Sequence, residues 1–85
     1  MTEFELIQGL RAGDETAFRY LVDTYQDRVY NTAIAIVQNA EDAEDVAQES
    51  LVRAVRNLDQ WDSSREFVPW LLAIAGNRCR TFLAQ

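Results

Sequence analysis

Apolar residues recur along this chain at steps of three and four positions, the spacing of helices that bury one face. The pattern predicts four helices, over about residues 3–12, 15–38 and 40–57, and from residue 67 or 68 onward. No stretch reads as a credible strand. The expected fold class is therefore all-α, a small bundle of about four helices in one domain.

Capping residues support these boundaries. Thr2 is followed three residues later by a glutamate, which is the capping-box pattern of a helix start. Gly13 is placed to end the first helix, and Asp14 can then cap the second. Asn39 is expected to end the second helix, and either Asn39 or Asp42 can cap the third.

The third predicted helix is the most regular of the four. Its apolar stripe consists of Ala43, Val46, Ala47, Ser50, Leu51, Ala54, Val55 and Leu58. Opposite this stripe, Asp45, Gln48 and Glu49 share one outward surface. Such a surface can be a metal site, a solvated face, or a patch that receives arginines from a partner helix. A metal site is the poorest of these, because bundle metal sites project inward from several helices. The pattern alone leaves the other two open.

A polar loop over residues 59–66 contains one aromatic residue, Trp61. It can be an anchor folded onto the core, which is the more frequent case, or a wall for a ligand or an unstacked base. Ser63, Ser64 and Arg65 follow it and offer hydroxyls and a guanidinium to bases or phosphates.

The fourth helix begins close to Pro69, which is tolerated only within a first turn. Asn77 and Arg80 face away from its apolar stripe, and Arg78 lies nearer the edge. Asn and Arg side chains suit base edges and phosphates, but a few of them on one helix are weak evidence alone.

Composition narrows the function further. The 85 residues carry a net charge of −6, whereas a free-standing binder of duplex DNA usually has the opposite sign. There is no histidine and only one cysteine, Cys79, which argues against a conventional zinc site, a histidine-based catalytic pair or an internal disulfide. Cys79 is expected to be a small buried or half-buried side chain. No cofactor and no metal are expected.

No apolar run approaches the ~18 residues of a membrane-spanning helix. The N-terminus has acids and no basic residues before its first apolar positions, so it does not read as a signal peptide. A cytoplasmic location is the resulting expectation, with no membrane partner.

Two segments, "DAEDVAQESLVRAVRNL" and then "FVPWLLAIAGNRCRTFL", together resemble a known family. They are similar to domain 2 of bacterial RNA polymerase sigma factors of the extracytoplasmic-function (ECF) group. The resemblance extends from about Leu6 to Leu83. Its most specific part is the acidic D-A-E-D-x-x-Q-E run followed downstream by W-L-x-x-I-A-x-N.

The resemblance implies a helical domain that docks on RNA polymerase core, without catalytic residues of its own. It assigns Asp45, Gln48 and Glu49 to binding the clamp helices of the β′ subunit. The loop and last helix would recognise the promoter −10 element as melted single-stranded DNA. The positions implied for this contact are Trp61, Ser63, Ser64, Arg65, Asn77, Arg78 and Arg80. An anti-sigma factor is a further expected partner.

The chain also departs from the family pattern. Gly76 stands where an arginine is usual, and Thr81 where an acidic residue is usual. The helix-turn-helix domain that reads the −35 element in such factors is absent, so a fragment of a longer factor is expected. The alternative function is a helical protein-interaction module, binding polymerase or an anti-sigma factor, that has lost DNA recognition.

Overall fold

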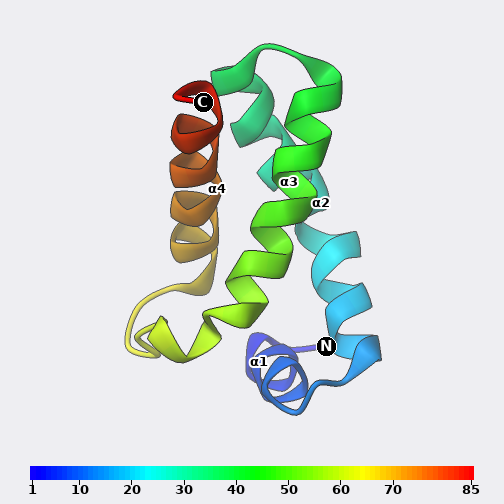
Figure 1. The fold of residues 1–85 in the computed structure, drawn as a ribbon. Helices are drawn as coiled ribbons and strands as arrows, with labels where there is room; N and C mark the ends of the chain where they lie inside the picture. The colour runs from blue at the N-terminus through cyan, green and yellow to red at the C-terminus, as the bar shows by residue number, and fades with distance from the viewer.

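A computed structural model describes all 85 residues, and its regular secondary structure is entirely helical. The elements are α1 (Glu3–Arg11), α2 (Glu15–Val37), α3 (Ala40–Arg56), the short 3-10 helix η1 (Leu58–Gln60) and α4 (Phe67–Leu83). Helices α2, α3 and α4 pack against one another, while α1 packs on α2 and lies across the end of the bundle near the chain's N-terminus (Figure 1). The predicted all-α bundle of about four helices is confirmed, with helix boundaries within one or two residues. None of these helices has the length and apolar character needed to cross a membrane.

Local capping explains why the boundaries agree. The Thr2 hydroxyl accepts a hydrogen bond from the Glu5 backbone N–H at 3.1 Å, and the Glu5 carboxylate accepts one from the Thr2 N–H at 3.0 Å. Asp14 caps α2, and the Asn39 side chain caps α3 by accepting from the Asp42 N–H at 3.0 Å. One detail differs from the expectation. The left-handed residue that ends α2 is Gln38, with φ 57°, and Asn39 serves only the next helix.

The core joins all four helices. Its largest fully buried hydrophobic side chains are Phe67, Leu6, Leu21, Leu51, Leu71 and Val29. A second, smaller cluster contains Ala33, Ala43, Val46 and Cys79 between the far ends of α2, α3 and α4. Burial raises the pKa of the Cys79 thiol above its ordinary value, so this residue is a neutral packing group. The predicted burial of Cys79 is confirmed.

Aromatic packing attaches the loop before α4 to the core. Phe67 is 1% exposed, and the rings of Tyr25, Trp61 and Trp70 surround it at centroid distances of 6.1, 5.6 and 5.8 Å. Trp61 meets Phe67 edge-on. The loop tryptophan is therefore an anchor, as the commoner of the two interpretations supposed, and it remains partly exposed.

Two glycines allow a matched test of helix packing. A Cβ on Gly9 would lie 2.5 Å from the Cβ of Ala17, so α1 approaches α2 too closely for any side chain there. A Cβ on Gly76 would meet only the Arg80 Nη1 at 3.6 Å, an ordinary contact.

We expect Gly9→Ala to lower the melting temperature and Gly76→Ala to raise it. Alanine in a helix interior gains up to about 1 kcal/mol over glycine, worth roughly 4–8 °C for a domain of this size. At Gly9 the steric clash exceeds this gain. Thermal denaturation followed by circular dichroism measures both. Shifts of the same sign in the two variants would contradict this account of the α1–α2 contact.

Candidate functional site

The outward face of α3 carries the acidic residues that the sequence singled out. Asp45, Gln48 and Glu49 are all exposed, while the apolar stripe of α3 faces the core. Val52, one turn further along, is also exposed and adds an apolar position beside them. The prediction that these residues share a solvent-facing surface is confirmed. We call Asp45, Gln48, Glu49 and Val52 the acidic face.

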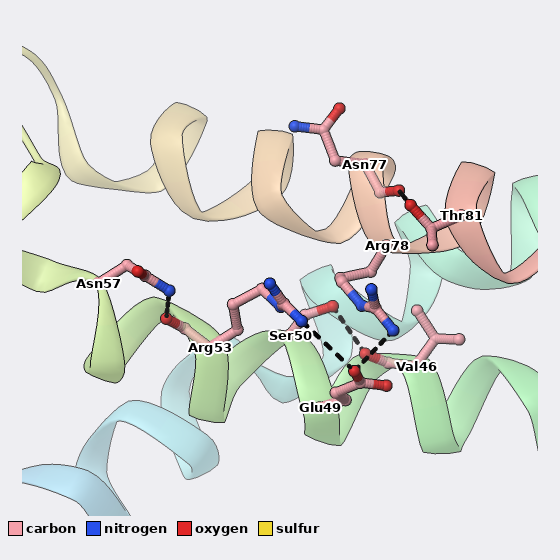
Figure 2. Close-up of polar contacts among 8 residues, drawn as sticks. All are labelled: Val46, Glu49, Ser50, Arg53, Asn57, Asn77, Arg78 and Thr81. Atoms are coloured by element: carbon pink, nitrogen blue, oxygen red, sulfur yellow. Dashed lines mark hydrogen bonds and ion pairs between the residues drawn. The ribbon is translucent and has the colours of Figure 1, made fainter.

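Glu49 differs from its neighbours because it is paired with two arginines. Its Oε1 lies 2.6 Å from Arg78 Nη2 on α4 and 3.9 Å from Arg53 Nη2 on its own helix (Figure 2). The Glu49–Arg53 pair has the favourable i,i+4 order, with the acid nearer the helix N-terminus. The Glu49–Arg78 pair links two helices and could not be read from helical spacing.

Arg78 is placed differently from the other residues expected to bind DNA. Its side chain is only 19% exposed, and its Nε is buried without a hydrogen-bond partner. The guanidinium reaches from α4 across to α3 and is committed to Glu49 (Figure 2). Arg78 therefore connects the acidic face to α4.

A polar groove runs between α3 and α4, with a volume of about 420 Å³. Its lining includes Arg53, Asn57, Gln60, Trp70, Asn77, Arg78 and Thr81. These amides, hydroxyl and guanidinium can donate to and accept from the edges of bases. Sequence reasoning found Asn77 and Arg78 of this set. Arg53 and Asn57 were missed, since they lie on another helix and join the groove through the packing of α3 on α4.

Asn77 and Arg80 form one exposed pair on α4. Arg80 Nη2 donates to Asn77 Oδ1, and the Thr81 hydroxyl donates to the Asn77 carbonyl oxygen at 3.0 Å. The amide nitrogen of Asn77 has no hydrogen bond within the chain and points away from the Glu49–Arg78 pair (Figure 2). It is available as a donor to a ligand.

Asp62 organises the loop before α4, a role that the sequence reasoning missed. Its Oδ1 accepts hydrogen bonds from the Ser64 backbone N–H at 2.9 Å and from the Ser64 hydroxyl at 2.7 Å. These two bonds hold the pKa of the Asp62 carboxyl below its ordinary value. Arg65 lies 3.9 Å from the other carboxylate oxygen. The Asp-x-Ser spacing is a local turn signal that could have been recognised in the sequence.

The loop separates two hollows. One, of about 670 Å³, lies between the loop and the start of α4 and is lined by Trp61, Arg65 and Trp70 among others. The other, of about 340 Å³, lies against α1 and contains Ser63 and the opposite side of Trp61. Trp70 borders both the larger hollow and the α3–α4 groove, so these two form one continuous surface along α4. Ser63 is outside that surface.

The site offers no arrangement suited to a metal ion. No group of three or more His, Cys, Asp or Glu side chains is clustered to hold one. The acidic residues of α3 are spread along an exposed face, as the helical pattern indicated.

Comparisons with known proteins agree with the fold and the motifs. The family model for sigma-70 region 2 matches residues 21–85. The chain is 41% identical over 71 residues to the ECF RNA polymerase sigma factor SigW of Bacillus subtilis, covering 84% of this chain and 38% of that protein. It is 34% identical over 83 residues to the ECF RNA polymerase sigma-E factor of Escherichia coli K12, covering 98% of this chain and 43% of that protein.

The chain thus spans about two fifths of the length of these relatives. A solved structure, the NMR structure of an engineered region 2 of sigmaE in complex with GTAAAA, superposes with a TM-score of 0.88 at 36% identity. The match covers 99% of this chain and 87% of that one. With the family model matching most of the chain and the fold agreeing over nearly all of it, the chain belongs to the sigma-70 region 2 family, within the ECF group.

Proposed function

We propose that this domain acts in transcription initiation by docking on RNA polymerase core and holding the promoter −10 element as a melted single strand. The observation that carries the proposal is the agreement in fold with a region 2 of sigmaE whose structure was solved in complex with GTAAAA. Polymerase would perform the chemistry, so the domain itself would contribute recognition and strand opening. Its proposed site of action is the cytoplasm, where RNA polymerase acts.

The acidic face supports the docking half of the proposal. Asp45 and Glu49 present carboxylates one helical turn apart, with the Gln48 amide beside them. Such a face fits a basic helical partner, because charge-assisted hydrogen bonds to arginine are strong and directional. We assign it to the clamp helices of β′. An anti-sigma factor is a second proposed partner of the domain.

The surface along α4 supports the DNA half. Asn77 and Arg80 supply exposed donors, and the α3–α4 groove adds Arg53 and Asn57. Trp61 and Trp70 provide aromatic surfaces beside the larger hollow. Stacking of a base on an aromatic ring is worth about 1–3 kcal/mol, which offsets the cost of unstacking it from the duplex. Arg65 at the rim would contact a phosphate, with Ser63 and Ser64 as flanking contacts.

Binding to core and to oligonucleotides tests the proposal. The 85-residue chain should bind purified bacterial core polymerase, and it should prefer a single-stranded −10 oligonucleotide over the same sequence as duplex. The net charge of −6 predicts weak duplex affinity at physiological salt. Tight binding of the isolated chain to duplex DNA would contradict the proposal.

We expect Arg80→Ala to weaken single-strand binding by roughly 3- to 10-fold without changing affinity for core. The change removes an exposed cation and its hydrogen bond to Asn77, and it touches nothing on the acidic face. Fluorescence anisotropy with the labelled strand and a pull-down with core measure the two affinities. Arg19→Ala, an exposed arginine of α2, serves as the matched control. Equal strand affinities for Arg80→Ala and Arg19→Ala would refute the assignment.

The second candidate is an interaction module that binds polymerase or an anti-sigma factor and no longer recognises DNA. Two observations favour it: the Ser64 hydroxyl and the Arg78 guanidinium are both engaged by carboxylates of the same chain. Core binding without any single-strand binding would select this function over the first.

A further inference from the structure

We propose that Arg78 is a positioning residue for the acidic face: it fixes the carboxylate of Glu49 so that one oxygen faces the polymerase. This inference rests on the proposed docking function. It gives Arg78, which the family resemblance places among the DNA contacts and which also lines the α3–α4 groove, a role towards the acidic face instead.

The geometry of the carboxylate is the first support. Arg78 Nη2 and Arg53 Nη2 both approach the same oxygen of Glu49, Oε1. Oε2 has no partner within the chain, and the Glu49 side chain is 48% exposed. A carboxylate held through one oxygen presents the other in a fixed direction (Figure 2). That free oxygen is an acceptor for an arginine or lysine of the partner.

Burial is the second support. The Arg78 side chain is 19% exposed, whereas Arg19, in an ordinary surface ion pair with Glu15, is 72% exposed. Holding a long side chain in one rotamer on an open surface costs entropy that offsets most of its charge interaction. Packing between α3 and α4 already restricts the Arg78 side chain, so its pairing with Glu49 loses little further side-chain entropy. The Arg78–Glu49 pair is therefore more restricted than the exposed Arg19–Glu15 pair.

In the alternative role, a DNA phosphate would have to share the Arg78 guanidinium with Glu49. Arg78 Nη2 lies 2.6 Å from Glu49 and Nε is buried, so a phosphate in the α3–α4 groove would find only Nη1 unengaged. Arg80, two residues on, is exposed and forms no ion pair within the chain. Arg80 is therefore the better phosphate contact on α4, and Arg78 serves Glu49.

Preorganisation gives the ion pair its functional effect. A flexible glutamate loses rotamer freedom when it binds, at roughly 0.5–1.5 kcal/mol per side chain. With Arg78 in place, Glu49 has lost that freedom before the polymerase arrives. Loss of Arg78 should thus weaken docking only where Glu49 is present to be positioned.

A double-mutant cycle tests this dependence. The proteins are the parent chain, Arg78→Met, Glu49→Ala and the double variant, each measured for affinity to purified core polymerase. We expect Arg78→Met to lower core affinity by about fivefold in the parent and by less than about twofold in the Glu49→Ala background. Arg78→Lys keeps a cation near Oε1 and should restore part of the loss. Arg19→Met, which breaks an exposed pair on α2, is the matched control and should change nothing.

Two further measurements separate this role from others. Thermal denaturation of each variant shows whether it is folded. If Arg78→Met is unfolded, Arg78→Lys and the conservative Arg78→Gln replace it in the double-mutant cycle. Single-strand affinity should stay within about twofold of the parent in Arg78→Met, since the proposal gives Arg78 no DNA contact.

If Arg78→Met lowered core affinity equally in the parent chain and in the Glu49→Ala variant, the inference would be overturned. A selective loss of strand affinity in Arg78→Met with core affinity unchanged would also overturn it. These results differ from failure of the proposed function, in which the parent chain itself would not bind core.

Discussion

Asp45→Lys is expected to remove measurable binding to core RNA polymerase while leaving the domain folded. Asp45 is exposed and makes no hydrogen bond or ion pair within the chain, so its replacement costs the fold at most about 0.5 kcal/mol. Towards a basic partner the reversal replaces an attraction by a repulsion. Such losses at charged interface pairs run to about 2–5 kcal/mol, a drop in affinity of about 30-fold or more.

The structure makes Asp45 a sharper test than Glu49. Both residues are exposed on the acidic face, so by exposure alone either one could be reversed. A lysine at position 49, however, would sit between Arg53 and Arg78 and would place three cations together at the α3–α4 contact. Reduced core binding by Glu49→Lys would then have two causes that cannot be separated: loss of the docking contact and disturbance of the α3–α4 contact.

Asp23→Lys is the matched control for Asp45→Lys. Asp23 is exposed on α2 and lies outside the acidic face, and its reversal changes the net charge by the same amount. A pull-down and an affinity titration with core polymerase measure the effect, and circular dichroism checks the fold. Similar losses in both variants would indicate a general charge effect and would remove the assignment of the acidic face.

The features predicted correctly from the sequence are those that depend on neighbours close in the chain. Helix caps act on backbone groups two or three residues away, as at Thr2, Asp14 and Asn39. The helix starts can therefore be recognised from these residues alone. The buried stripe of α3 and the exposure of Asp45 follow from a single helical period. For these features no knowledge of the tertiary structure was needed.

The features that were missed depend on how separate helices meet. Helical spacing puts Arg78 near the edge of the apolar stripe but cannot say that Glu49 of α3 lies opposite it. The α3–α4 groove is missed for the same reason, because Arg53 joins Asn77 only after the two helices pack. The close approach at Gly9 likewise exists only where α1 crosses α2.

Phe67→Ala is expected to be the most destabilising single change of those considered. Phe67 is 1% exposed and contacts three other aromatic rings, so truncation leaves a large cavity. Phenylalanine to alanine changes in cores cost about 3–5 kcal/mol. Domains of this size have only about 5–15 kcal/mol of total stability. The melting temperature should fall by at least about 12 °C.

The same change should also affect the strand-binding surface more than the acidic face. Trp61 packs edge-on against Phe67, and that contact attaches the loop to the core. Without it, the wall of the larger hollow loses its support, whereas the acidic face lies on the opposite side of α3 from its buried stripe. At temperatures where Phe67→Ala is still folded, single-strand affinity should therefore drop further than core affinity. Phe4→Ala removes the same side chain from a position that is 72% exposed, and it should leave the melting temperature almost unchanged. Similar melting curves for the two phenylalanine variants would show that Phe67 does not hold the core together.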